Sequence, residues 1–175
     1  GMAEPSKIAV VRYVDDFLFV INRSKCSEEQ LQALPEQLIQ VAEKMGWTLA
    51  HDKSVWSPSE KIEFLGLEIH VTSNGLQARL TKKRYDDLCA VLKRVRSNLR
   101  ANRTLHPRHA ARLGGYLAAA SCVLPDAAFL AAPIARWAAQ AARRAGWSTK
   151  QSPPPEFTIY IDNAFEISKQ YARAW

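Results

Sequence analysis

Two adjacent carboxylates, Asp15 and Asp16, are the residues of this chain best suited to chemistry. They stand between two apolar runs, Ile8 to Val14 and Phe17 to Ile21, whose β-branched and aromatic residues predict strands. Aspartate is depleted from strands and common in turns, so the pattern predicts a hairpin with the acids near its tip. Neighbouring carboxylates repel one another, and oxygen ligands suit Mg²⁺. The chemistry suggested is metal-assisted phosphoryl transfer.

An α+β layer is expected to position this hairpin. Ser27 and Gln30 have the spacing of a capping box, and apolar residues then recur at helical spacing until Gly46 ends the run. Asn74-Gly75 between apolar runs predicts a further hairpin. Short strands are expected at residues 47–50, 54–57, 62–71 and 76–80. The first eighty residues therefore predict an antiparallel sheet with a packing helix.

From Thr81 the apolar period changes from two to about 3.6, which predicts a bundle of helices. Three helices are expected. The first begins after Thr81, and the other two span about 107–122 and 126–145, where Pro133 should kink or break the last one. Gly114-Gly115 would allow close approach of another helix or of a nucleic-acid backbone. Residues 148–155 predict a proline-rich linker. The run 157–164 predicts a short C-terminal strand carrying Asp162.

Positive charge is concentrated in the helical part. The net charge of the chain is +7, and between Arg79 and Arg112 eleven Lys or Arg face two Asp. Such a local basic surface is typical of proteins that follow a phosphate backbone, although a solvated helix face is the plain alternative. No apolar run is long enough for a membrane span, and no secretory signal is recognised. Three widely spaced cysteines indicate reduced thiols and an intracellular protein, cytoplasmic or nuclear.

The order of motifs resembles the second half of a reverse transcriptase palm followed by its thumb. The motifs are Tyr13-Val14-Asp15-Asp16, then a helix, then Gly46-Trp47-Thr48-Leu49 before Lys53, and then Phe64-Leu65-Gly66-Leu67-Glu68-Ile69. The likeness runs from about Val10 to about Leu124 and is closest to the LTR-type, DIRS-like and pararetroviral branches. It implies an RNA-directed DNA polymerase, which is a nucleotidyltransferase. The segment Val14 to Leu18 also resembles a telomerase motif, but the Phe-Leu-Gly segment fits retroelements better.

The resemblance implies roles for particular residues. Asp15 and, less directly, Asp16 would bind Mg²⁺ or Mn²⁺, and Lys53 would act on the triphosphate or leaving pyrophosphate. The primer grip would be Phe64, Leu65 and Gly66. Basic thumb residues would contact an RNA–DNA or DNA primer-template duplex: Lys82, Lys83, Lys93, Arg94, Arg96, Arg100 and Arg103. A solvated turn, an exposed lysine and ordinary core packing are the structural alternatives. His106 and His109 are expected to be solvated or to face phosphate rather than to bind metal.

Three parts are implied: a partial palm at 1–80, a helical thumb at 81–147, and a linker with the possible start of a ribonuclease H-like domain at 148–175. Asp162 resembles the first catalytic acid of that nuclease, although Phe165-Glu166-Ile167 departs from the usual glycine-rich sequence. A further palm Asp and the fingers are expected to come from another segment, so this chain alone is not expected to polymerise. The alternative is a domesticated module that binds nucleic acid or a protein partner without catalysis.

Overall fold

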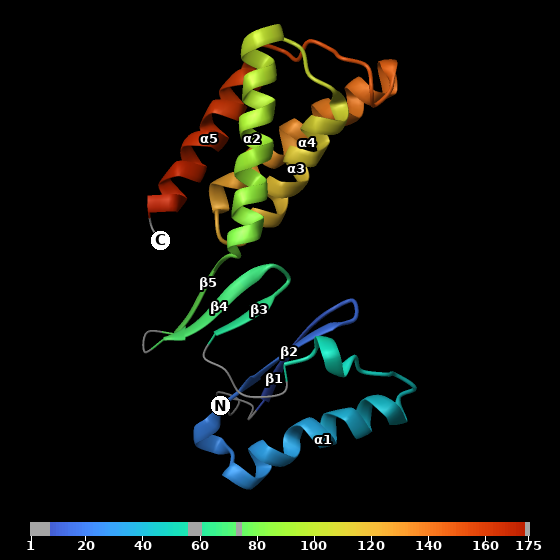
Figure 1. The fold of residues 1–175 in the computed structure, drawn as a ribbon, viewed down its shortest axis with the longest axis vertical. Coiled ribbons are helices and arrows are strands. Elements are labelled where there is room, and N and C mark those ends of the chain that lie inside the picture. The colour runs from blue at the N-terminus through green and yellow to red at the C-terminus, as the bar shows by residue number, and fades with distance from the viewer. Residues whose placement is uncertain (1–7, 56–60, 73–74, 174–175) are drawn as a thin grey trace, which may run out of the picture. The chain divides into compact units, whose positions relative to one another are not determined.

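The computed structural model describes residues 8–55, 61–72 and 75–173. The chain divides into two compact units, residues 1–59 and 60–175 (Figure 1). The described residues form two antiparallel sheets and five α-helices, which confirms the expected α+β class. None of the helices in these ranges is long and apolar enough to cross a membrane.

The first unit contains a hairpin and one long helix. Strands β1 (Ile8–Tyr13) and β2 (Asp16–Ile21) pair antiparallel, with Tyr13 opposite Asp16. After a 3₁₀ turn at Arg23–Lys25, helix α1 spans Glu28–Lys44. It starts at the expected capping box, in which the Gln30 amide donates to Ser27 Oγ. The apolar stripe of α1 is only half-buried, and among its residues only Ala42 is fully buried.

The region after α1 differs from the expectation. Residues 47–50 and 54–55 form no strand, and residues 56–57 lie outside the described ranges. Trp47 is held by its side chain rather than by strand pairing, because its ring packs on Phe17 with 5.6 Å between ring centroids. A 3₁₀ turn, His51–Lys53, follows. Aromatic packing therefore holds Trp47 where the residue types predicted a strand.

The second unit begins with a three-stranded sheet of order β3 (Lys61–Phe64), β4 (Leu67–Thr72) and β5 (Gly75–Leu80). The strand expected at 62–71 is divided by a two-residue turn. Leu65 and Gly66 both have positive φ, 52° and 73°, as a tight hairpin requires. Thr72 pairs with Gly75, which confirms the second expected hairpin. The described strands therefore form two separate sheets, one in each unit.

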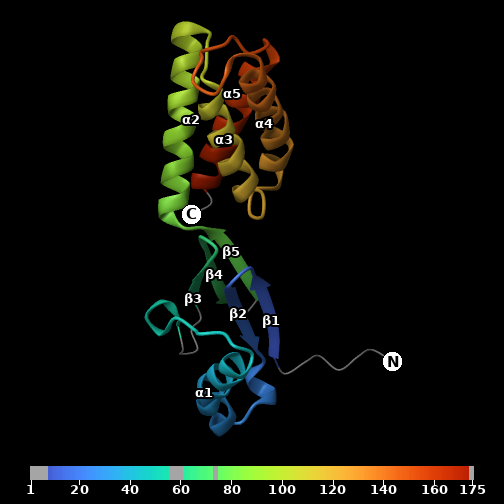
Figure 2. The same cartoon turned by 90° about the vertical axis from the view of Figure 1, so that its right-hand side faces the viewer.

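Four helices complete the second unit and contain most of the core (Figures 1 and 2). They are α2 (Lys82–Asn102), α3 (Pro107–Ala120), α4 (Pro125–Ala145) and α5 (Glu156–Arg173). The bounds of α3 and α4 agree closely with the sequence prediction, and α4 continues through Pro133 without a break. Gly114 serves close helix packing, because an added Cβ would lie 3.2 Å from the Ala135 Cβ of α4.

The C-terminal segment is helical, so the expected strand at 157–164 is wrong. Phe157, Ile161, Ala164 and Ser168 are buried, and their spacing of four, three and four residues places them on one helix face. The segment before α5 is tied to the bundle, since the backbones of Leu105 and Gln151 exchange two hydrogen bonds of 2.9 and 3.1 Å. Residues 148–175 thus belong to the same compact unit as α2, α3 and α4.

Two tyrosines connect α5 with the rest of the unit. The Tyr85 hydroxyl of α2 donates to the Ser168 carbonyl at 3.0 Å, and burial raises the pKa of Tyr85 to about 12, so the hydroxyl stays a donor at neutral pH. The Leu80 amide of β5 donates to the Tyr171 hydroxyl at 2.6 Å. The sheet, α2 and α5 are therefore joined by hydrogen bonds as well as by apolar packing.

Candidate functional site

The acid-bearing hairpin has a two-residue turn, Val14-Asp15. Val14 adopts φ of 56°, a left-handed conformation that is uncommon for a β-branched residue. Arg12 supports the turn, because its Nε donates to the Val14 carbonyl at 2.9 Å while its guanidinium lies 4.8 Å from the Trp47 ring centroid and 5.6 Å from that of Phe17. The turn is therefore strained and held from within the first unit.

The two carboxylates have different backbone positions. Asp15 occupies the turn, whereas Asp16 is the first residue of β2 and pairs with Tyr13. Both residues are exposed to solvent. Within the described ranges no three His, Cys, Asp or Glu residues gather closely enough to hold a metal ion. The hairpin therefore offers carboxylate oxygens of the kind that suit Mg²⁺ or Mn²⁺, but only part of a ligand set.

Lys53 ends the short 3₁₀ turn His51–Lys53 in the same unit as the hairpin. Its backbone amide donates to the Ala50 carbonyl at 3.2 Å, and the Ser54 hydroxyl donates to the same carbonyl at 2.6 Å. Its side chain is exposed and forms no ion pair with any residue that the structure describes. The Lys53 ammonium is thus available to an anionic ligand.

The Phe64-Leu65-Gly66 segment forms the β3–β4 turn of the second unit, not a continuous strand. Arg84 from α2 lies directly over Gly66, where an added Cβ would come within 2.6 Å of the Arg84 Cδ. The Thr81 amide also donates to the Gly66 carbonyl at 3.1 Å. This turn lines a cavity of about 550 Å³ together with α2 and α3. Gly115 also lines the cavity, and an added Cβ there would meet nothing within 4 Å.

The basic residues expected to form one surface stand in different local environments. Lys82 pairs with Asp86 at 2.6 Å, and Lys83 lines the cavity next to the β3–β4 turn. Lys93 is exposed on α2. Arg103 caps the end of α2 with φ of 50°. Lys82 and Lys93 are about three turns apart on α2 and therefore lie on the same side of that helix.

Arg96 and Arg100 both pair with a carboxylate of α5, although the Arg100 side chain remains 61% exposed. The Arg96 Nε donates to Asp162 Oδ1 at 2.7 Å, and the Arg100 guanidinium lies 3.6 Å from the same oxygen. Arg96 also stacks on the Phe165 ring at 4.2 Å. Asp162 lies inside helix α5 rather than at the end of a strand, so its expected position is wrong. Through these contacts Asp162 joins α5 to α2.

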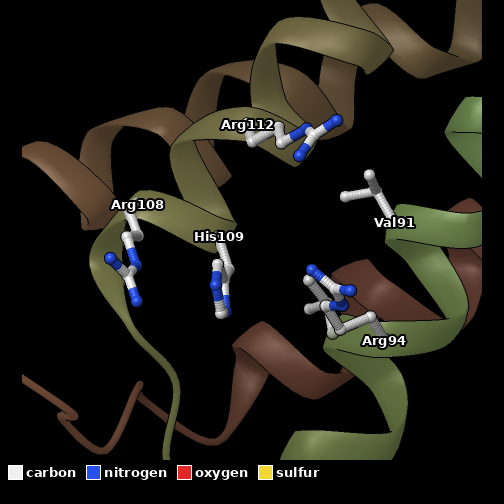
Figure 3. Close-up of a pocket in the computed structure, with 6 residues that line it drawn as sticks. Val91, Arg94, Arg108, His109 and Arg112 are labelled. Atoms are coloured by element: carbon white, nitrogen blue, oxygen red, sulfur yellow. The ribbon is translucent and has the colours of Figure 1, made fainter. Parts of the chain in front are cut away.

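A second, smaller cavity lies between α2 and α3 and has a volume of about 280 Å³. Figure 3 shows Arg94 from α2 and His109 and Arg112 from α3 facing a common space. Arg108 also lines this cavity, beside Val91 and Val95. The basic surface predicted from the sequence contains Arg94 but not Arg108 or Arg112, whose i, i+4 spacing around His109 places all three near one helix face.

The two histidines of this region are partly withdrawn from solvent. Their rings meet edge to face with centroids 5.2 Å apart, and the Nδ1 atoms of both are buried without a hydrogen-bond partner in the described part of the chain. Burial lowers the pKa of His109, and its electrostatic interactions with His106, Arg108, Arg94 and Arg112 lower it further. His109 is therefore mostly neutral near pH 7.

Comparison with protein-family models, with curated proteins and with solved structures finds no significant match.

Proposed function

We propose that this chain supplies the palm and thumb portions of an RNA-directed DNA polymerase of the retroelement type. The observation that carries the proposal is the Tyr13-Val14-Asp15-Asp16 hairpin, which presents two exposed carboxylates at a strained two-residue turn. Natural hairpin turns favour glycine or asparagine at positions with positive φ, so a valine held there by Arg12 supports a functional constraint on the turn.

The predicted site residues have distinct tasks in this proposal. Asp15 and Asp16 would hold Mg²⁺ or Mn²⁺ through their carboxylate oxygens, together with a further acid from another segment of the enzyme. A metal held there would supply Lewis-acid chemistry for phosphoryl transfer. Lys53 interacts with the incoming triphosphate through its exposed ammonium. The Phe64-Leu65-Gly66 turn positions the primer terminus, and α2 and α3 contact the backbone of the primer-template duplex.

Reconstitution tests the polymerase function. The chain is co-expressed with a polypeptide carrying the fingers and the remaining palm acid of the same source, and primer extension is measured in Mg²⁺. We expect extension that Asp15→Asn abolishes. The control Asp52→Asn removes an equally exposed carboxylate of the same unit and should preserve extension. Extension that survives Asp15→Asn would contradict the assignment of this hairpin.

The second candidate function is nucleic-acid binding without catalysis. It is favoured by one observation: the basic cavity between α2 and α3 is formed within the second unit alone, whereas the described carboxylates form no complete metal site. Its test is the affinity of the chain for a primer-template RNA–DNA duplex across a salt series, with Lys93→Glu and Arg94→Glu as the charge-reversed variants. Arg96 and Arg100 are left unchanged because they pair with Asp162. Binding that these reversals weaken, without extension after reconstitution, would favour this function.

A further inference from the structure

We propose that the cavity between α2 and α3 is a binding site for a single phosphate group, held by Arg94, Arg108 and Arg112 beside His109. The proposal does not depend on polymerase activity, because all four residues lie in the second unit. The phosphate group can come from the backbone of a nucleic acid or from free phosphate, and these two sources present the same oxygens to the site.

The first argument is charge. Three arginines from two helices line the cavity, and no Asp or Glu lines it among the described residues. Arg94 and Arg108 form no ion pair there, in contrast to Arg96 and Arg100 on another face of α2. The Arg112 guanidinium donates a hydrogen bond of 3.5 Å to the Tyr116 hydroxyl. This bond raises the pKa of Arg112, and so does the charge of Asp87, which lines the neighbouring cavity. Gathering like charges is unfavourable unless an anion joins them.

The second argument is the local backbone. Helix α3 begins at Pro107, and its first turn carries Arg108 and His109 but no acidic residue. The N-terminus of a helix already has partial positive charge, so most proteins place Asp or Glu there. His106, the N-cap residue, makes no capping hydrogen bond with its side chain. Arg108 therefore adds its charge to the positive end of the helix dipole. The first-turn amides of Arg108 and His109 already donate to protein carbonyls, so an anion here would be held by side chains.

The third argument is the chemistry of the side chains. Arginine presents a planar fork of N–H donors that matches two phosphate oxygens at once. Val91 and Val95 from α2 form an apolar wall, which lowers the local dielectric constant and strengthens charge interactions at the cavity. The volume of about 280 Å³ lies below the usual range for drug-sized ligands and suits one small group with its water.

The first experiment uses the full chain labelled with ¹⁵N and follows the imidazole of His109 by NMR in a buffer free of phosphate. Sodium phosphate is titrated against sodium chloride of equal ionic strength. A bound phosphate stabilises the imidazolium form and should raise the pKa of His109, against the burial and the neighbouring cations Arg94, Arg108 and Arg112 that lower it. Chloride should not reproduce this effect, and identical titrations in the two salts would argue against free phosphate as the source.

The second experiment compares two double variants of equal charge. Arg94→Gln with Arg108→Gln removes two cavity arginines, whereas Arg136→Gln with Arg143→Gln removes two exposed arginines of α4. We measure the affinity of each for a short mixed-sequence DNA duplex across a salt series. The cavity variant should bind roughly tenfold more weakly, with a salt slope about one unit shallower, while the control stays closer to the unchanged chain.

The two experiments distinguish the sources. Loss of duplex affinity confined to the cavity variant identifies a nucleic-acid phosphate. Phosphate binding by the unchanged chain without that loss identifies free phosphate. Equal duplex affinity of both variants, together with a His109 titration that phosphate does not move, would overturn the proposal. The NMR measurement needs no substitution, so an unfolded variant would not obscure the result.

Discussion

At the scale of single residues, the left-handed backbone of the β3–β4 turn restricts which side chain can replace Gly66. Gly66 has φ of 73° and lies under Arg84, so Gly66→Ala must accept a left-handed alanine and displace the Arg84 side chain. We expect this change to lower the free energy of unfolding of the second unit by about 1–2 kcal/mol. Urea unfolding followed by circular dichroism measures it.

Gly115 provides the matched control. It lies inside α3, and an added Cβ meets nothing within 4 Å. Gly115→Ala should therefore stabilise the second unit by about 0.5–1 kcal/mol, because alanine loses less backbone entropy than glycine in a helix. Equal destabilisation by both substitutions would contradict the turn geometry assigned to Gly66.

His109 gives stability a predictable dependence on pH. Its pKa is lowered in the folded state, mainly by burial, so between the folded and the unfolded pKa the unfolded chain binds more protons. The free energy of unfolding should therefore fall as the pH is lowered from 7 through about 6.5 and below, the ordinary range of histidine. His109→Gln should reduce that fall.

The measurement is urea unfolding at a series of pH values in a buffer free of phosphate, because a bound anion would raise the pKa of His109 and weaken the effect. An unchanged pH dependence in His109→Gln would show that other groups cause it.

At the scale of elements, α5 shows why residue types alone predicted a strand at 157–164. Phe157, Ile159, Tyr160 and Ile161 are residue types that favour strands, and a short apolar run does not separate strand from buried helix. Pro153, Pro154 and Pro155 followed by Glu156 are a helix-start signal that was interpreted only as a linker. Tertiary packing against α2 and α4 decides the outcome.

Phe157 tests this packing. It is 1% exposed, and its ring lies 4.9 Å from that of Trp137 on α4. Phe157→Ala should destabilise the second unit by about 3 kcal/mol or more, because it leaves a cavity in the core. Ile159→Ala, at a position that is 59% exposed on the same helix, should change stability little. Similar small effects of both substitutions would contradict the docking of α5 in the bundle.

Asp162 tests the second contact of α5. It accepts the charged hydrogen bond from Arg96 while remaining 41% exposed, so solvent screens the pair. Asp162→Asn should lower the free energy of unfolding of the second unit by about 1 kcal/mol. Glu166→Gln breaks only the exposed pair with Lys169 and serves as the control. A double-mutant cycle with Arg96→Gln measures the coupling, and zero coupling would refute a joining role.

At the scale of the whole molecule, the local patterns were predictable and the assembly was not. Capping, periodicity and turn residues predicted α1, α2, α3, α4 and the two confirmed hairpins, because each depends on neighbours in sequence. The separation of Arg96 and Arg100 from Arg94 depends on which helix covers each face of α2. The cavity containing Arg108 and Arg112 likewise requires α2 and α3 to pack side by side. Such contacts arise only from tertiary structure.

The most direct test of the proposed function is the rate of single-nucleotide incorporation into a primer-template duplex by the reconstituted enzyme in Mg²⁺. The rates of the unchanged chain, Asp15→Asn and Asp52→Asn are compared at equal duplex occupancy. The proposal predicts that Asp15→Asn reduces the rate by at least about a thousandfold, since an essential ligand of the metal ions is lost, and that Asp52→Asn leaves it unchanged. Equal rates for Asp15→Asn and Asp52→Asn would contradict a catalytic role of this hairpin.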